Sequence, residues 1–554
     1  MTTTPRTLVP VLALACLFLV AALPSLAQAP DPAEGLLPPP TPVTEDGGPP
    51  PWELTLRDAV ARALRENLDI QVARIDPASA RETVTYQDAV FEPELQGSGS
   101  WDRQTQEPSS RFSPASRTDK QLSATWVDPL RTGGQVEAGV FYREMVSNYP
   151  PGSDIFGLVP TTMVAGVQLT VRQPLLRNYG LRINRTAIEQ AKNSLGISEE
   201  QLRQRVMEVV EQVESAYWKL LGARRQLDVA RASYKLAQDF LKDTRVKVEV
   251  GTLPEIEITT AEAEVADRDG NVIVAENAVR NAEDNLRVLL HVPQDSAEWE
   301  RPIVPVDRPV TDKVDVDLDE AIREALAHRP EVKVAELQLR NRELDARWRK
   351  NQVRPDLSLV GTWRATGNNY DYYPLIVPGP GGVPQEVWVR KDQGRTDAFS
   401  EIPDRDNSDW SIGFNLRLPI RNRRARADLA RARLASEQAR LQVQKTRLQV
   451  RVEVRQAVRD VESAFRRMAS ARANVVLQRK KMEAEQKRFE NGLSTAFKVL
   501  QFQTDLRDAE SRLINAAVDY NQALVRLLRV RGVLLEQRGI EVPAPAEVGV
   551  TAGR

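Results

Sequence analysis

The sequence contains almost no residues suited to redox or metal chemistry. Among its 554 residues there is one cysteine, Cys16, and there are two histidines, His291 and His328. Disulfides need paired cysteines, and zinc sites are built from clusters of cysteine and histidine. We therefore expect no disulfide, no metal and no cofactor, and we interpret both histidines as ordinary helix-end residues. No convergent polar cluster indicates an enzyme.

The chain also lacks an excess of charge of one sign and, beyond its N-terminus, any long apolar run. It carries 76 Lys and Arg against 77 Asp and Glu, and its mean hydropathy is −0.42. Nucleic-acid-binding proteins normally show a basic excess, so no nucleic-acid partner is expected. A membrane-spanning helix needs about 20 apolar residues, and no stretch of this kind follows the N-terminal one.

The N-terminus has the pattern of a secretory signal peptide, which we assign to residues 1–29. A basic residue precedes an apolar run over residues 8–23, and small residues follow it. An alternative is a lipoprotein signal in which Cys16 is acylated, although the apolar run continues past this cysteine. The following segment, 30–52, is rich in proline and is expected to be a linker.

The rest of the chain contains one pattern twice. Leu56–Leu64 matches Leu318–Leu326, and Val213–Tyr217 matches Val461–Phe465 further along. Self-similarity over such a distance indicates a duplicated structural unit. We predict a first repeat at 53–291, a connecting equatorial segment at 292–317, a second repeat at 318–531 and a C-terminal tail at 532–554.

Each repeat ends in two long runs whose apolar residues recur every seven positions. The first run reaches a glycine, Gly251 or Gly492, and the heptads resume beyond it. This pattern predicts an antiparallel coiled-coil hairpin in each repeat, at 182–291 and 421–531. A second row on the first helix of each hairpin is polar and includes Arg224. We interpret this polar row as a face in contact with water.

The lengths of these helices predict how they pack. At about 1.5 Å per residue, the first helix of each hairpin is roughly 100 Å long and the returning helix roughly 60 Å. A shorter amphipathic helix, near 69–90 and 331–352, precedes the strands of each repeat. We expect this helix to stack end to end on the returning helix, so that one long helix packs against two shorter ones.

Between the short helix and the hairpin, the helical period changes to the alternation of a strand. Apolar and polar residues alternate within 91–173 and within 353–419, with long polar loops rich in glycine and proline between the strands. About ten alternating residues is the length of an outer-membrane strand. The first repeat has further strand-like sequence at 121–127 and 135–145, so the chain has four or six strands. We favour a wider sheet over an external hairpin.

Alternating strands are most often part of a soluble sandwich, and heptads are most often purely structural. Their duplicated combination resembles the TolC family of outer-membrane efflux ducts. The resemblance spans about residues 54–535 and rests on the opening Leu-x-x-Ala-(Val/Ile)-x-x-Ala-Leu of each repeat, the strand-to-helix turns at Pro174 and Pro419, and the glycine tips. It implies a mainly helical duct with a periplasmic tunnel of hairpins and a trimeric outer-membrane β-barrel of strands.

The resemblance also implies partners and a site. The partners would be two further copies in a homotrimer, outer-membrane lipid, a periplasmic adaptor (membrane fusion protein) and an inner-membrane pump. The gate and the adaptor-docking site would lie at the hairpin tips, at Gly251, Thr252, Leu253, Glu255, Glu257, Gly492, Leu493, Ser494, Lys498 and Gln501.

The tips differ from the family pattern in ways that matter for the gate. Glu257 and Lys498 stand six residues after the glycines, where the family often has Asp, and Ser494 stands where it often has Arg. A cation-binding acidic ring and the family's gate ion pairs are therefore not expected here. Glu255 and Glu257 facing Lys498 form an alternative closing pair, and solvated tips are the competing interpretation.

We predict a passive, non-enzymatic export conduit across the periplasm and the outer membrane, within a tripartite efflux or type I secretion system. The alternative is a periplasmic adaptor, which also uses helical hairpins. An adaptor would show a single hairpin, however, and not two copies with membrane strands. The sequence does not indicate the transported substrate, the pump or the adaptor.

Overall fold

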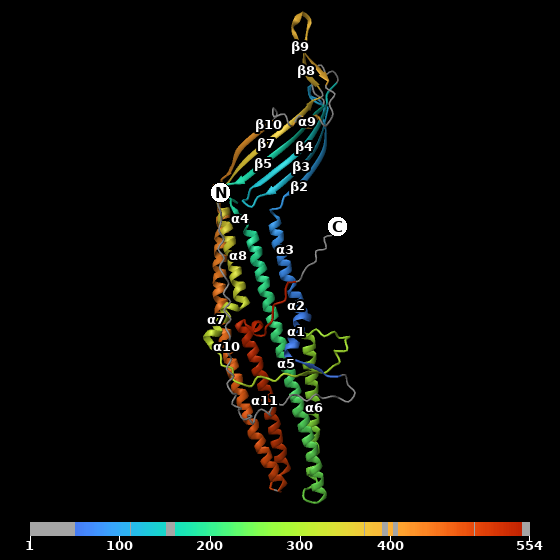
Figure 1. The fold of residues 1–554 in the computed structure, drawn as a ribbon, viewed down its shortest axis with the longest axis vertical. Coiled ribbons are helices and arrows are strands. Elements are labelled where there is room, and N and C mark those ends of the chain that lie inside the picture. The colour runs from blue at the N-terminus through green and yellow to red at the C-terminus, as the bar shows by residue number, and fades with distance from the viewer. Residues whose placement is uncertain are drawn as a thin grey trace, which may run out of the picture.

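The structure is a computed structural model, and it describes residues 50–110, 112–150, 161–370, 372–390, 397–400, 402, 408–491 and 493–545. The expected signal peptide with Cys16, most of the proline-rich segment, Gly492 and the end of the tail lie outside these residues. The described chain is long and narrow, with a sheet near one end and two helical hairpins at the other (Figure 1). Among the described helices, none is long and apolar enough to cross a membrane.

Each repeat begins with short helices and ends in a long hairpin. The helices of the first repeat are α1 (Leu56–Glu66), α2 (Leu68–Ala73), α3 (Ile75–Ala89), α4 (Leu181–Asn184), α5 (Thr186–Glu249) and α6 (Ile256–Leu289). Those of the second are α7 (Leu318–His328), α8 (Pro330–Gln352), α9 (Asp397–Ser400), α10 (Arg423–Glu490) and α11 (Ala496–Arg531), after which α12 (Leu534–Gln537) follows.

The first helices of the two repeats are capped at equivalent positions. The backbone N–H of Asp58 donates to the Thr55 hydroxyl at 3.0 Å, and that of Asp319 donates to Asp317 Oδ1 at 2.9 Å. These caps satisfy donors that the first turn leaves unpaired. The helix predicted near 69–90 is interrupted in the structure, because Pro77 has no N–H to bond the carbonyl of Ala73, where α2 ends.

The short helices stack on the returning helices, which confirms the predicted packing. The Asn67 side chain caps α2 and donates from Nδ2 to the carbonyl of Leu289, at the end of α6, at 2.9 Å. In the second repeat, Gly532 ends α11 with φ +78° and lies against the start of α8. A Cβ at this glycine would be 3.0 Å from the carbonyl carbon of His328. The long helix α10 therefore packs against two collinear shorter helices, α8 and α11, and α5 packs against three, α2, α3 and α6.

Six strands form one antiparallel sheet in the order β10-β7-β5-β4-β3-β2. They are β2 (Glu94–Thr105), β3 (Ser116–Pro129), β4 (Gln135–Asn148), β5 (Thr161–Pro174), β7 (Asp356–Tyr370) and β10 (Ser408–Arg417). The strand-like sequences at 121–127 and 135–145 are β3 and β4. They lie between β2 and β5 within the sheet, so the external-hairpin interpretation is wrong.

The sheet has one polar and one apolar face, as the alternation predicts. Gln96, Thr125, Gly139 and Gln168 are successive partners in one row across the strands, and they belong to the polar face. The opposite face is apolar, and β10 contributes to it Trp410, Ile412, Phe414 and Leu416, each at least 65% exposed.

The segment between β7 and β10 contains strands, although its composition predicts a polar loop. Two further strands, β8 (Tyr372–Pro378) and β9 (Pro384–Arg390), pair as a separate hairpin that projects beyond the sheet (Figure 1). The turn η2 (Pro380–Gly382) joins them, with Gly381 and Gly382 at φ +79° and +78°. The composition rich in glycine and proline is therefore the turn of a hairpin, flanked by β-branched residues.

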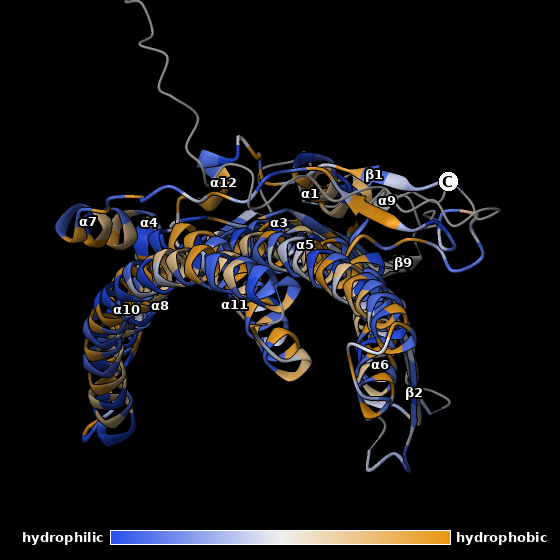
Figure 2. Ribbon diagram, turned by 90° about the horizontal axis from the view of Figure 1, so that it is seen from below, coloured by the Kyte–Doolittle hydropathy of each residue, from blue (hydrophilic) through white to orange (hydrophobic). Residues whose placement is uncertain are grey.

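Viewed along its length, the helical part is an arc with α10 at one end and α6 at the other (Figure 2). The short elements α1, α7, α12 and β1 (Trp52–Leu54) lie on the convex side (Figure 2). There β1 pairs in parallel with β6 (Ile303–Pro305), which belongs to the connecting segment. Two apolar cores lie at the bases of the hairpins, one centred on α5 and one on α10 and α11.

Candidate functional site

At the base of the first hairpin the polar row does not face water, contrary to the prediction, whereas nearer the tip the row is exposed. In the first hairpin, Arg224 donates from Nη2 to Glu283 on the returning helix at 2.7 Å, and Arg231 pairs with Glu276 at the same distance. Arg245 pairs with Glu262 at 2.6 Å. Glu283, Glu276 and Glu262 belong to an acidic heptad row on α6 that opposes the basic row on α5.

Exposure along this ladder of ion pairs increases toward the tip. The side chains of Arg224 and Glu283 are only 11% and 8% exposed, whereas those of Arg245 and Glu262 are 55% and 50% exposed. Charges removed from water need full compensation, while exposed pairs contribute little. The buried Arg224–Glu283 pair at the base is therefore the one whose loss would destabilise the hairpin most.

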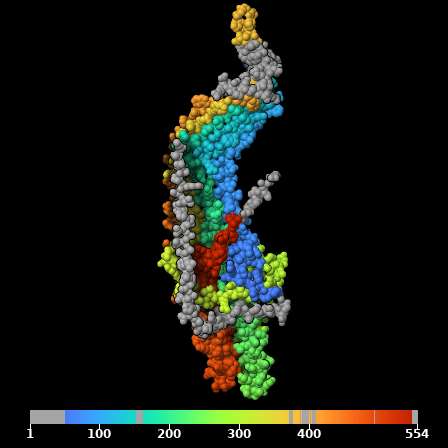
Figure 3. All heavy atoms as spheres, viewed as in Figure 1, coloured from blue at the N-terminus to red at the C-terminus, as the bar shows by residue number. Residues whose placement is uncertain are grey.

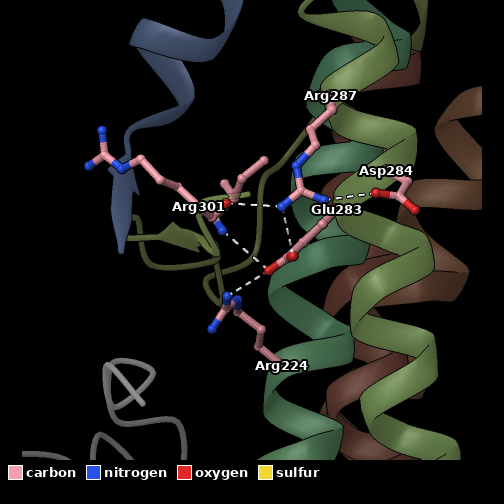
Figure 4. Close-up of polar contacts among 6 residues, drawn as sticks. Arg224, Glu283, Asp284, Arg287 and Arg301 are labelled. Atoms are coloured by element: carbon pink, nitrogen blue, oxygen red, sulfur yellow. Dashed lines mark hydrogen bonds and ion pairs between the residues drawn. The ribbon is translucent and has the colours of Figure 1, made fainter. Parts of the chain in front are cut away.

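Glu283 joins the hairpin base to the connecting segment (Figure 4). Besides Arg224, it accepts from Nη2 of Arg287 at 3.1 Å and from the backbone N–H of Ile303 at 3.2 Å. Arg287 also donates to Asp284 Oδ1 at 2.8 Å and to the Arg301 carbonyl at 2.9 Å. One buried carboxylate thus holds two guanidinium groups and the first residue of β6.

Other buried polar side chains bind the connecting segment on the convex side of the arc. The Tyr217 hydroxyl contacts Asp307 Oδ2 at 2.6 Å, and burial raises the pKa of this tyrosine, helped by the Asp307 carboxylate. In the second repeat, Tyr520 donates to the Asp312 carbonyl at 2.8 Å, and Asn521 accepts from the N–H of Val310 at 2.9 Å. Helix side chains therefore satisfy the backbone of an otherwise irregular segment.

The concave side of the helical arc carries a polar groove at the level of the connecting segment. On α5, Gln212, Ser215 and Lys219 point into it, on the opposite side of the helix from Tyr217. Its charged lining is mixed in sign, with Glu211, Asp460 and Asp519 against Lys219, Arg467 and Arg526. The inner surface of the arc is therefore hydrophilic here. Among the described residues, no three His, Cys, Asp or Glu side chains are grouped as a metal site requires.

The two hairpin ends lie next to each other (Figure 3), and an apolar cluster joins them. Phe240 of α5 and Phe489 of α10 pack against each other with tilted rings whose centres are 5.6 Å apart, and Leu253 packs against the same cluster. The Lys247 ammonium lies 4.1 Å from the centre of the Phe489 ring. Further from the tips, Arg268 of α6 is 2% exposed and donates to the Thr504 hydroxyl of α11 at 2.6 Å.

The first tip is a tight turn. Gly251 has φ +78°, a conformation that favours glycine, and the Thr252 N–H and hydroxyl donate to the Lys247 carbonyl at 2.9 and 2.8 Å. Glu255 is exposed, and within one chain no ion pair of the described residues joins Glu255 or Glu257 to Lys498.

The second tip is organised around Glu485, a carboxylate that the sequence pattern does not single out. The Ser494 hydroxyl donates to Glu485, and this hydrogen bond, with the nearby charges of Arg488 and Lys498, lowers the pKa of Glu485. Ser494 and Lys498 therefore lie together, whereas Gln501 is exposed, and Leu493 is 73% exposed. Glu485 could have been noticed as an acid near the end of a basic helix, but its partner depends on the turn.

The family follows from comparison with known proteins. A model of the outer membrane efflux protein family matches residues 153–291 and 321–533. The chain belongs to this family. The match includes the hairpins of both repeats, which favours the channel over the adaptor alternative. No curated protein matches the sequence.

Solved structures show the same fold. The CmeC outer membrane channel of Campylobacter jejuni is 16% identical with a TM-score of 0.60, and the match covers 86% of each chain. A membrane protein from Pseudomonas aeruginosa is 20% identical with a TM-score of 0.60, covering 86% of this chain and 90% of the other. VceC of Vibrio cholerae is 14% identical with a TM-score of 0.59, covering 86% and 96%. The predicted fold class is confirmed.

Proposed function

We propose that this chain is the outer-membrane channel of a tripartite export system, and that three copies join edge to edge around the passage. The observation that carries this proposal is that the sheet ends at β2 and β10 and does not close. All 12 residues of β2 and all ten of β10 are exposed. Unpaired strand edges are not tolerated in lipid, so another copy has to cover them.

The helices beside these strand edges also present apolar residues without a partner. On α10, Leu434, Leu441 and Leu448 recur every seven residues and are 71%, 57% and 61% exposed. The other end of the arc carries a second stripe on α2, α3 and α6, formed by Leu68, Val72, Ile75, Tyr86, Val274 and Val288. Contiguous exposed apolar stripes mark interaction surfaces. The sheet and the helical layer therefore both end at the same two edges of the molecule.

The two edges carry opposite charge. Helix α10 holds 19 Lys and Arg against 8 Asp and Glu, whereas α6 holds 8 Asp and Glu against 3 Arg. Opposite potentials steer association and set the register of an interface. A basic edge meeting an acidic edge of the next copy continues around a ring, which is a heterologous contact that closes.

The enclosed space would be an aqueous conduit without catalytic groups. The polar groove on the concave side of the helices and the polar face of the sheet would both line it. Residues 1–29 would direct export as a signal peptide, residues 30–52 would be a linker, and 532–554 a tail. The repeats at 53–291 and 318–531 would be the two structural units of each copy.

The hairpin tips would dock a periplasmic adaptor and, through it, an inner-membrane pump. Exposed apolar residues near the tips support this part of the proposal, since Val250, Ile256, Leu493 and Phe497 are 67%, 66%, 73% and 69% exposed. Gly251, Gly492 and their neighbours would form the gate. The pair of Glu255 or Glu257 with Lys498 stays a prediction for contacts between copies.

Membrane fractionation of cells that express the chain tests the proposal. We expect a trimer in the outer-membrane fraction, and we expect Leu441→Glu on the α10 edge to reduce the trimer fraction. Leu236→Glu is the matched control, because Leu236 is 40% exposed on α5, which lies inside the arc and not at its edge. A native chain recovered as a soluble monomer would overturn the proposal.

A further inference from the structure

We infer that the apolar face of the sheet binds one lipid of the outer membrane, with an acyl chain in a groove beside α9 and an anionic phosphate headgroup at Arg103 and Lys120. The inference rests on the proposed function, because the apolar face meets lipid only when three sheets close around the passage. The site combines a groove floored by small residues with positive charge at one end. A surface that is only apolar would hold acyl chains but would not select a headgroup.

The groove lies on the apolar face, across β2, β3 and β4. Its floor contains Gly97, Gly99 and Ala124, so the strand surface there has almost no side chains. A Cβ added at Gly97 would meet no atom within 4 Å. The volume of the groove is about 680 Å³, which is within the range of small-molecule sites. A lipid chain can therefore lie against the backbone of the sheet here.

The helix α9 bounds this groove on one side. It lies against β5 and β7, and its residue Ala398 has no exposed surface. The Phe399 ring stacks on Tyr142 of β4, with ring centres 6.0 Å apart and planes 15° apart. Tyr142 belongs to the apolar face, because it is the register partner of Leu122 on β3. The stacked rings therefore form a wall that separates the groove from the rest of this face.

Positive charge lies just beyond the groove, toward the ends of the strands that are far from the helices (Figure 1). Arg103 and Lys120 are diagonal neighbours on the apolar face of the β2–β3 pair, so their Cβ atoms are about 7 Å apart. Arg103 is exposed, and no hydrogen bond or ion pair of the described residues involves its side chain. The Lys120 ammonium pairs with Glu144 Oε1 at 3.4 Å, which uses one of its three donors. Both cations can therefore donate to a phosphate.

Trp101 indicates that these cations lie at the level of the lipid headgroups. It is 76% exposed on the apolar face, and its ring centre is 5.6 Å from Lys120 Nζ. Outer-membrane barrels have aromatic residues at both membrane interfaces. A cation is costly in hydrocarbon, whereas at the interface it attracts anionic lipid. A lipid whose phosphate binds Arg103 and Lys120 therefore extends an acyl chain over Gly99 and Gly97.

Native mass spectrometry of the detergent-solubilised trimer tests the inference. The two probes are dimyristoyl-phosphatidylglycerol and dimyristoyl-phosphatidylcholine, which have the same acyl chains and differ in headgroup charge. We expect one phosphatidylglycerol to bind for each copy, at concentrations where phosphatidylcholine does not bind. Equal binding of the two lipids to an intact trimer would overturn the inference and leave the proposed function intact. Absence of a trimer would overturn the proposed function and the inference with it.

The headgroup contact is tested by Arg103→Gln. We expect the affinity for phosphatidylglycerol to fall about fivefold, as the loss of one cation beside an anionic headgroup implies. Arg117→Gln is the matched control, because Arg117 is an exposed arginine of β3 on the polar face of the sheet. An equal loss of affinity in both variants, or no loss in Arg103→Gln, contradicts a phosphate site at Arg103.

The acyl-chain contact is tested by Gly97→Leu, which fills the groove. We expect the affinity for phosphatidylglycerol to fall about tenfold, because the leucine replaces buried methylenes of the lipid. Gly361→Leu is the matched control. Gly361 is also on the apolar face, and a Cβ there also meets no atom within 4 Å, but it lies outside the groove. Native affinity in Gly97→Leu would show that the groove holds no acyl chain.

Discussion

The two hairpins share a backbone plan but are held together by different chemistry. Counted from the tips, Arg224 opposite Glu283 in the first hairpin corresponds to Phe465 opposite Leu524 in the second. In the second hairpin, an ion pair between the two helices lies closer to the tip, where Arg479 pairs with Glu510 at 2.8 Å. At its base, Phe465 instead packs against Tyr520 with tilted rings whose centres are 5.6 Å apart.

This difference shows that a heptad position fixes which residues meet but not which chemistry they use. At the base of the first hairpin, the acceptor Glu283 is needed because it binds the N–H of Ile303 as well as Arg224. At the base of the second, Tyr520 and Asn521 bind the connecting segment, and the neighbouring level is apolar. The first hairpin therefore depends on a buried charge network, and the second on packing.

The largest effect is expected from removing the buried carboxylate. Glu283→Leu leaves Arg224 and Arg287 without their shared partner, which costs about 3–5 kcal/mol. The double variant Arg224→Phe with Glu283→Leu copies the second hairpin at this level and should recover part of that loss. Thermal unfolding followed by circular dichroism measures both. Equal destabilisation of the single and double variants would show that the Arg224 pair is not the cause.

The next effect concerns the aromatic contact between the hairpin ends. Phe489→Ala removes a ring that is 6% exposed and contacts Phe240 and Lys247, at a cost of about 3 kcal/mol. Val248→Ala, three residues before the glycine of the first hairpin as Phe489 is in the second, should cost much less. Hydrogen exchange of the tip amides reports the difference as a change in local opening. Similar protection in both variants contradicts a special role for Phe489.

The stability of the second tip should depend on acid pH in a way that the stability of the first tip does not. The pKa of Glu485 is lowered in the folded state, so its contribution to tip stability is present above the ordinary glutamate pKa and is lost as the pH falls through the lowered value. Ser494→Ala removes the largest cause of this lowering and should move the acid opening of the second tip to higher pH. Hydrogen exchange between pH 3 and 6 measures the shift. Thr244→Ala, at the position equivalent to Glu485, should leave the acid profile unchanged.

The smallest effect is expected at the exposed end of the ladder. Arg245→Ala removes an ion pair whose side chains are about half exposed, and should cost less than about 1 kcal/mol. Raising the salt concentration should reduce that cost further, because exposed pairs are screened. Chemical denaturation at low and high salt checks both points. A cost equal to that of Glu283→Leu would remove the distinction between base and tip.

Much of the fold could be predicted from the sequence because periodicity reports secondary structure directly. The heptads located both hairpins to within a few residues, and alternation located β3 and β4. The hairpin β8–β9 was missed because its turn composition is also that of a loop. The ion-pair ladder does not follow from the basic row of α5 alone, because its partners form an acidic row on α6 that is 17 to 59 residues away in the chain.

The candidate site was less predictable. The turn at Gly251 could be predicted from the glycine itself, because its φ of +78° is a conformation that few other residues adopt. The contacts of Phe489 with Phe240 and Lys247, and of Ser494 with Glu485, depend instead on how far one helix slides past another. Local sequence does not encode that distance.

The sequence by itself determined the duplicated plan, the helical hairpins, the two-faced strands and the family, because each depends on local periodicity or on the order of elements. Only the tertiary structure decided the six-strand sheet order, the burial of Arg224 with Glu283 and the two complementary edges of the arc. These features arise where distant segments meet. Their energy depends on register, burial and the dielectric surroundings, which no local pattern specifies.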